Sequence, residues 1–136
     1  MIWMLDTNIA IHFANRGAGY ERIARRMSGR SPGEIRVSAI TLAELRYGVA
    51  RSREKSQNRA ALEALLELIL VEDFPSGAAT DFGEIRVALE QAGTRIGPYD
   101  LLIAAHARHR RATLVSNDEA EFKRVPGLAL VNWLRP

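Results

Sequence analysis

Residues 2–8 read Ile-Trp-Met-Leu-Asp-Thr-Asn, an apolar run that stops abruptly at three polar residues. A short apolar run of this kind predicts a buried strand over residues 2–5, and the Asp-Thr-Asn that follows predicts a helix capped by Asp6. Apolar residues at helical spacing then continue to Phe13. The beginning of the chain therefore predicts a strand–helix unit with an acidic residue at its junction.

The rest of the chain repeats this alternation of short apolar runs and helical patterns. Pro98 stands at a first helical position, which suits proline because that N–H has no partner within the helix, and Ser31-Pro32-Gly33 predicts a loop. Further strands are predicted at 35–37, 71–74, 113–115 and 128–131, and helices at 20–27, 41–51, 58–70, 78–91 and 98–107. Strands that alternate with helices predict an α/β sandwich around a largely parallel sheet.

Length and composition narrow the classes of protein that the chain can belong to. At 136 residues, 47% of them hydrophobic, residues 1–136 are expected to form a single domain with a sizeable core. The absence of cysteine excludes disulfides, thiolate zinc sites and a cysteine nucleophile. No apolar run approaches the roughly 20 residues that span a bilayer, and the start of the chain does not resemble a signal peptide. We therefore expect a cytoplasmic protein without a membrane segment.

The basic residues are almost all arginine. Only Lys55 and Lys123 of the 19 basic residues are lysine, and the net charge is +3. Arginines gather at 22–30, 46–53 and 108–111. Arginine matches the geometry of phosphate and carboxylate groups, so these clusters indicate either a polyanionic ligand or acidic partner, or an ordinary solvated surface. Composition does not choose between the two.

Four acidic residues stand at the beginnings of predicted helices, two of them just after strands: Asp6, Glu44, Asp100 and Asp118. Each has a purely structural explanation. Asp6, Asp100 and Asp118 suit helix N-termini, and Thr41-Leu-Ala-Glu44 has the pattern of a capping box. Parallel strands place their carboxyl ends at one edge of a sheet, however, so the fold can gather these acids into one cluster.

Gathered carboxylates repel one another unless cations lie among them. Oxygen ligands suit Mg²⁺, with Mn²⁺ as the alternative, and such ions can activate water for cleavage of a phosphodiester. Zinc is disfavoured, because the only histidines are His12, His106 and His109, which we expect to serve packing or surface roles. The chain has no P-loop and no GxGxxG motif.

Four segments resemble, in order, the acidic motifs of the PIN domain, and within that family the VapC toxins. They are Met-Leu-Asp-Thr-Asn-Ile at 4–9, Ser-Ala-Ile-Thr-Leu-Ala-Glu-Leu-Arg-Tyr-Gly at 38–48, the most specific stretch at 93–107, and Ser-Asn-Asp-Glu-Ala-Glu-Phe at 116–122. The resemblance covers nearly the whole chain. It implies a three-layer α/β/α sandwich around a mainly parallel sheet. Ser116 replaces the threonine of many relatives and keeps the hydroxyl.

The resemblance also implies an activity, that of a Mg²⁺-dependent endoribonuclease in which a metal-activated water attacks an RNA phosphodiester. The residues that it implies as catalytic and metal-holding are Asp6, Glu44, Asp100 and Asp118, and those that support them are Thr7, Asn8 and Ser116. The fourth acidic position varies in the family, so Glu121 is an alternative to Asp118 or acts beside it.

As partners, the resemblance implies a cognate VapB-like antitoxin, an RNA substrate and a second copy of the chain in a homodimer. The antitoxin's carboxy-terminal segment would wrap the toxin and bring a basic residue to the acidic site. Two alternatives stay open: a PIN nuclease that processes RNA without being a toxin, and a catalytically silent module that binds nucleic acid or protein. A receiver-like signalling domain is disfavoured, because Lys123 does not follow a strand.

Overall fold

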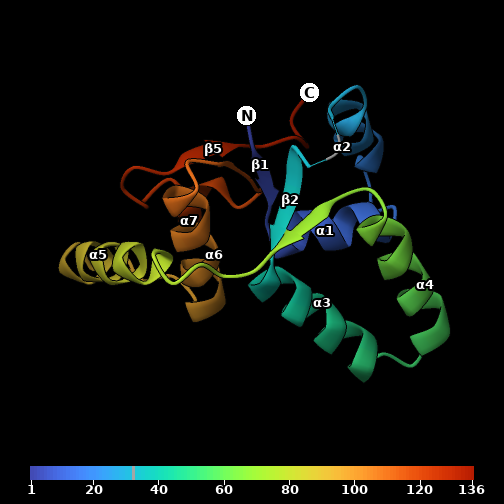
Figure 1. Cartoon of the computed structure of the whole chain (residues 1–136), viewed down its shortest axis with the longest axis horizontal. Helices are drawn as coiled ribbons and strands as arrows, with labels where there is room; N and C mark the ends of the chain where they lie inside the picture. The colour runs from blue at the N-terminus through green and yellow to red at the C-terminus, as the bar shows by residue number, and fades with distance from the viewer. Residues whose placement is uncertain (32) are drawn as a thin grey trace.

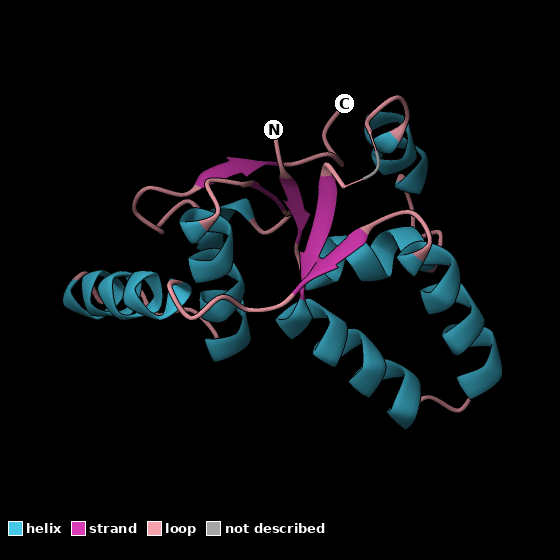
Figure 2. Ribbon diagram, viewed as in Figure 1, coloured by secondary structure: helices cyan, strands magenta, loops and turns pink. Residues whose placement is uncertain are grey.

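Five parallel strands form one sheet in the computed structural model, which describes residues 1–31 and 33–136 (Figures 1 and 2). In chain order the strands are β1 (Trp3–Leu5), β2 (Ile35–Ser38), β3 (Leu70–Glu72), β4 (Thr113–Val115) and β5 (Ala129–Val131). The sheet order is β3-β2-β1-β4-β5, and every neighbouring pair is parallel. The predicted α/β class is confirmed, and all five strands end at the same edge of the sheet.

Seven helices surround the sheet: α1 (Thr7–Ala14), α2 (Tyr20–Met27), α3 (Ala39–Arg51), α4 (Lys55–Leu66), α5 (Ala78–Gln91), α6 (Pro98–His109) and the short α7 (Glu119–Phe122), counted over the described residues. Helices α5 and α6 cover one face, while α1 and α2 cover the other. Helices α3 and α4 form a V that extends away from the sheet (Figure 1). No helix within 1–31 or 33–136 is long and apolar enough to cross a membrane.

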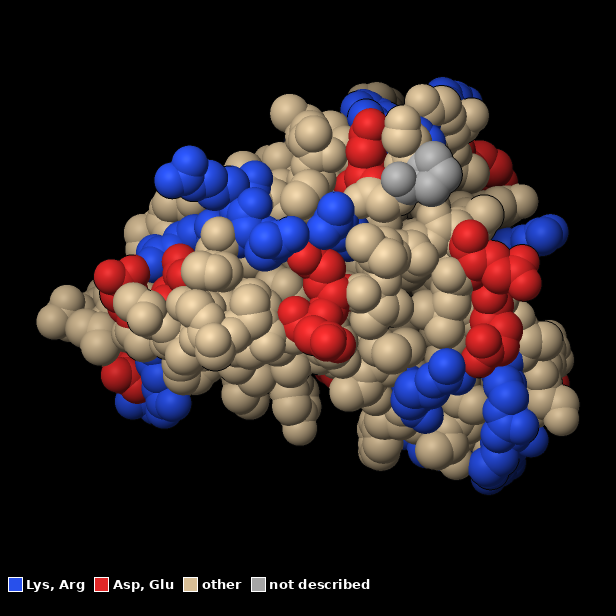
Figure 3. Space-filling model, viewed as in Figure 1, with Lys and Arg blue, Asp and Glu red and all other residues tan. Residues whose placement is uncertain are grey.

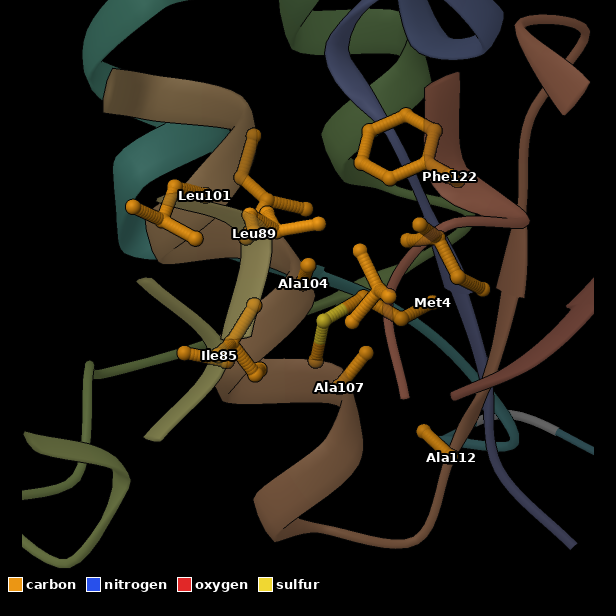
Figure 4. Packing of buried hydrophobic residues seen from close by; sticks show 12 residues of the cluster. Met4, Ile85, Leu89, Leu101, Ala104, Ala107, Ala112 and Phe122 are labelled. Carbon is orange, nitrogen blue, oxygen red and sulfur yellow. The ribbon is translucent and has the colours of Figure 1, made fainter. Parts of the chain in front are cut away.

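Alternation along β1 divides the core into two layers. Met4 points to the face covered by α5 and α6, where it lies among Ile85, Leu89 and Ala104 (Figure 4). Leu5 points to the opposite face, as successive side chains in a strand do. Alanines on α6 let this helix approach the sheet closely, and the burial of one side chain the size of Met4 contributes roughly 1.5–3 kcal/mol. The strand that carries Asp6 is thus fixed from both sides.

A third apolar cluster holds the α3–α4 pair in place. Ala10 of α1 is buried against Leu45 and Val49 of α3 and against Leu62 and Leu65 of α4. Helix α1 begins directly after β1 and packs against this pair. The position of α3, which carries Glu44, therefore depends on α1 as well as on β2.

The helix predicted to start at Thr41 begins earlier. Its N-cap is Ser38, whose Oγ accepts a hydrogen bond from the Ile40 amide at 3.1 Å. The capping box read at Thr41 and Glu44 is therefore wrong, because the chain turns into the helix directly at the end of β2 and Glu44 falls in the second turn. Thr41 is fully buried instead of capping.

The helix predicted over 58–70 also has different bounds. Helix α4 begins at Lys55 and ends at Leu66, and Leu70 is the first residue of β3, which ends at Glu72 and not at Phe74. The apolar spacing continued through Ile69 because residues of both elements contact the core. Pro32, in the predicted loop, lies outside the described residues.

Candidate active site

The predicted acidic residues meet at the carboxyl edge of the sheet. Asp6 follows β1 directly, Asp118 comes after β4, and Asp100 lies in the first turn of α6. The negative charges of Asp100 and Asp118 both act on Asp6, and those of Glu44 and Asp118 act on Asp100. The fold therefore brings all four acids into one electrostatic cluster. Their roles as metal-holding and catalytic groups stay predictions.

Asp6 is the most buried member of the cluster, with 2% of its surface exposed. Its Oδ1 accepts a hydrogen bond from the Ile9 amide at 2.8 Å, so the carboxylate caps α1 as predicted. Burial raises the pKa of Asp6 to about 6, hydrogen bonds from Ser116 and Ile9 oppose the rise, and the charges of Asp100 and Asp118 add to it. The ionised form of Asp6 is therefore costly in free energy unless a cation lies nearby.

Glu44 is oriented by two buried threonines. Thr7 Oγ1 lies 2.6 Å from Glu44 Oε1 and 3.2 Å from Thr41 Oγ1. A hydroxyl has one proton to donate, so Thr7 donates to the shorter, charged contact and Thr41 donates to Thr7. The sequence marked Thr7 as supporting but assigned Thr41 to a cap. The apolar residues that flank Thr41 were the only sign that it is buried.

Glu121 joins the cluster beside Asp118. The Glu121 amide donates to Asp118 Oδ1 at 3.2 Å, and the Gly97 amide donates to Glu121 Oε1 at 3.3 Å. Burial raises the pKa of Glu121 to about 7, and a side-chain hydrogen bond with Asp118 and the charge of Asp100 add to the shift. Burial also raises the pKa of Asp100, with a hydrogen bond to Glu121 opposing. Glu121 therefore lies beside Asp118 in the cluster, and which of the two takes the fourth acidic role stays a prediction.

Two of the three predicted supporting residues make contacts within the cluster. Ser116 is fully buried; its Oγ accepts from the Asp118 amide at 2.9 Å, and its hydroxyl also bonds to Asp6. Thr7 bonds to Glu44, as described above. Asn8 differs: it is exposed and its side chain makes no hydrogen bond to any described residue. Its amide is therefore free to reach a ligand.

The donor set fits a hard divalent cation. Every side chain of the cluster offers carboxylate or hydroxyl oxygens, which Mg²⁺ and Mn²⁺ prefer. As they stand, no three acidic or histidine side chains in the described part of the chain are arranged to hold an ion directly. Mg²⁺ commonly takes only one or two carboxylates and keeps several waters. Burial and, after it, the mutual repulsion of the acids raise the pKa of Asp6 and Asp100, and a cation would relieve the repulsion.

Some of the arginines in the predicted clusters are engaged within the chain. Arg46 pairs with Glu63, Arg108 with Asp81 and Glu84, and Arg110 with Glu72. Figure 3 shows basic side chains in a band over β5, α7 and the neighbouring strands, beside an acidic patch near the end of β3. Arg46, Arg108 and Arg110 are therefore paired within the chain, and the number of arginines alone overstates the positive charge that is available to bind a polyanion.

Comparison with known proteins places the chain in a family. The PIN domain model matches residues 3–128. Ribonuclease VapC2 of Rickettsia felis is 43% identical over 135 residues, covering 98% of both chains, and the tRNA(fMet)-specific endonuclease VapC of Shigella flexneri is 39% identical over 132 residues, covering 96% of this chain and 97% of that one. The crystal structure of VapBC2 from Rickettsia felis, bound to a DNA fragment from its promoter, contains a chain that matches with a TM-score of 0.89 and 42% identity, over 98% of this chain and 99% of that one. The chain belongs to the PIN-domain family and, within it, to the VapC ribonucleases.

Proposed function

We propose that this PIN-domain protein is the toxin of a toxin–antitoxin pair and cleaves RNA as a divalent-metal-dependent endoribonuclease, with residues 1–136 acting as one domain in the cytoplasm. The observation that carries the proposal is the convergence of Asp6, Glu44, Asp100 and Asp118 at one sheet edge. Isolated helix caps would not interact in this way. A catalytically silent module would have no need of a set of acids that destabilises its own charges.

Asp6, Glu44 and Asp100 would hold Mg²⁺, with Mn²⁺ as the alternative, and Asp118 would complete the acidic pocket. When bound, such an ion lowers the pKa of a water and stabilises charge that develops on the phosphate. The chain's own contribution is orientation: the hydroxyl of Thr7 fixes Glu44, and that of Ser116 fixes Asp6. Asn8 is exposed beside them and would contact the RNA or its phosphate.

A VapB-like antitoxin would bind in the groove between α1, α3 and α4. Apolar side chains line this groove, among them Ile11, Ala14, Leu45 and Val49, and Glu44 lies at its wall. An apolar helical segment fits such a lining, and a basic residue of the segment beside Glu44 would neutralise the acidic site. Chains of the matching crystal structures assemble as VapBC. A homodimer, as the resemblance implies, is part of the proposal.

The first experiment measures cleavage of total RNA by the purified protein and by Asp100→Asn, each with Mg²⁺ and with EDTA. Asp73→Asn is the matched control, because Asp73 is exposed and is not among the acids whose charges act on the cluster. We expect cleavage by the wild type and by Asp73→Asn with metal, and none by Asp100→Asn or with EDTA. Cleavage that survives the substitution or the chelator would contradict the proposed mechanism.

A second experiment separates the toxin from an RNA-processing nuclease. Expression of the wild type is expected to arrest growth, and expression of Asp100→Asn is not. Co-expression of a cognate VapB-like antitoxin is expected to restore growth and to yield a complex. Cleavage of RNA in vitro without growth arrest in the cell would favour the processing nuclease.

A further inference from the structure

His106 lies fully buried in a polar network behind the acidic cluster. Its Nδ1 is 2.8 Å from Ser38 Oγ, and its Nε2 is 3.6 Å from Glu72 Oε2. The ring meets Phe74 edge-on, with the centroids 5.5 Å apart. One side chain of α6 thus contacts both the junction of β2 with α3 and the end of β3. Neither the catalytic proposal nor the apolar core accounts for this network.

The contacts of Ser38 decide which ring nitrogen carries the proton. Ser38 Oγ already accepts a hydrogen bond from the Ile40 amide, so its own proton is free to be donated to Nδ1. The remaining ring proton then lies on Nε2 and faces Glu72 Oε2 at 3.6 Å, beyond hydrogen-bond distance. Neither of these two atoms has a hydrogen-bond partner among the described residues. The opposite tautomer would leave the Ser38 proton without this acceptor and would turn a lone pair towards Glu72. The Nε2–H form is the one that gives the Ser38 proton an acceptor and turns a donor towards the carboxylate of Glu72.

The surroundings keep the ring neutral. Burial lowers the pKa of His106, Glu72 opposes this, and Arg110 and His109 add to the lowering. The charge of Glu72 is balanced at its other oxygen, where Oε1 lies 3.1 Å from Arg36 and 2.8 Å from Arg110. Because Arg36 belongs to β2 and Arg110 caps α6, this carboxylate fixes the same two elements as the imidazole does.

The hydrogen bond lies at equal distance along the chain from two of the acids. Asp100 precedes His106 by six positions on α6, and Glu44 of α3 follows Ser38, the N-cap of that helix, by six positions. Six helical residues rise about 9 Å. A fixed contact between these two points therefore limits how far the two acid-bearing helices can separate or rotate at the site.

We propose that His106, as its neutral Nε2–H tautomer, is a positioning residue that ties the helix bearing Asp100 to the N-terminus of the helix bearing Glu44. The inference rests on the proposed function for its catalytic consequence. The tie itself is a property of the folded chain and is measurable without any substrate.

The wild-type protein is examined first, by ¹⁵N NMR of the histidine rings at neutral pH. The expected result is a neutral His106 with its proton on Nε2. A charged ring, or a proton on Nδ1, would overturn the assignment, and this measurement needs neither a variant nor activity.

Kinetics with an RNA that the wild type cleaves then test the consequence. His106→Leu is expected to lower kcat at least about tenfold with KM little changed, because misalignment of catalytic groups acts on the chemical step. His106→Asn keeps an acceptor near the position of Nδ1 and is expected to recover most of that loss. His109→Leu, on the exposed end of the same helix, is the matched control and should leave kcat unchanged. Equal losses in the Leu and Asn variants, or no loss in either, would overturn the proposal.

A double-mutant cycle keeps the two proposals distinguishable. If the wild type cleaves no RNA, the proposed function fails, and the free energies of unfolding of Ser38→Ala, His106→Leu and the double variant still test the tie. Coupled effects support it, and additive effects overturn it.

Discussion

Replacement of Thr7 by valine would test whether the buried hydroxyls orient the acidic site. Valine keeps the shape and the branching at Cβ but removes the hydroxyl that donates to Glu44 Oε1 at 2.6 Å. A hydrogen bond to a charged group is worth about 1.5–3 kcal/mol. Glu44 is only half-buried, so water replaces part of this bond, and we take the lower end of the range. About 1.5 kcal/mol corresponds to roughly a tenfold fall in rate.

The assay is cleavage of an RNA substrate at saturating Mg²⁺, with kcat and KM measured separately. Thr7→Ser is the matched control, because serine keeps the hydroxyl and loses only a methyl group. We expect Thr7→Val to lose about tenfold in kcat and Thr7→Ser to stay within about twofold of the wild type. Denaturation curves verify that both variants are folded. Equal rates for the two folded variants would refute the reasoning that the Thr7 hydroxyl orients Glu44.

Three further predictions concern stability. Burial raises the pKa of Glu121 to about 7 and that of Asp6 to about 6, so the free energy of unfolding of the metal-free protein should fall as pH rises from about 4 to 7. Urea titrations should show a shallower fall in Glu121→Gln, and an equally steep fall in this variant would contradict the raised pKa of Glu121. Met4→Ala should lower the free energy of unfolding by about 2–5 kcal/mol, measured by chemical denaturation, because Met4 is fully buried. A decrease below about 1 kcal/mol would contradict this and would mean that the core closes around the cavity. Burial would raise the pKa of Asp81, but hydrogen bonds from Arg108 and His109 outweigh burial and lower this pKa. Ionised Asp81 therefore stabilises the folded protein above its unfolded pKa, and the free energy of unfolding should fall less steeply below about pH 4 in Asp81→Asn than in the wild type. The same acid dependence in both proteins would contradict this.

The sequence by itself predicted the helix beginnings at which Asp6, Asp100 and Asp118 lie. Asp6 caps α1 and Asp118 caps α7 as expected, since an apolar run and the polar residue after it are neighbours in the chain. Pro98 starts α6 as its chemistry requires. Signals of this kind act over a few residues, so they are legible without tertiary structure. The bounds of α5, at 78–91, were predicted for the same reason.

Only the tertiary structure decided how these local units meet. The place of β1 between β2 and β4 puts Asp6 at the middle of the sheet edge, and strand order depends on how the helices pack. The cap of α3 at Ser38, and not at Thr41, depends on where β2 ends. Ser38 and His106 are 68 positions apart. Neither residue bears a local mark of the other, because their hydrogen bond exists only once the sheet has brought α3 and α6 together.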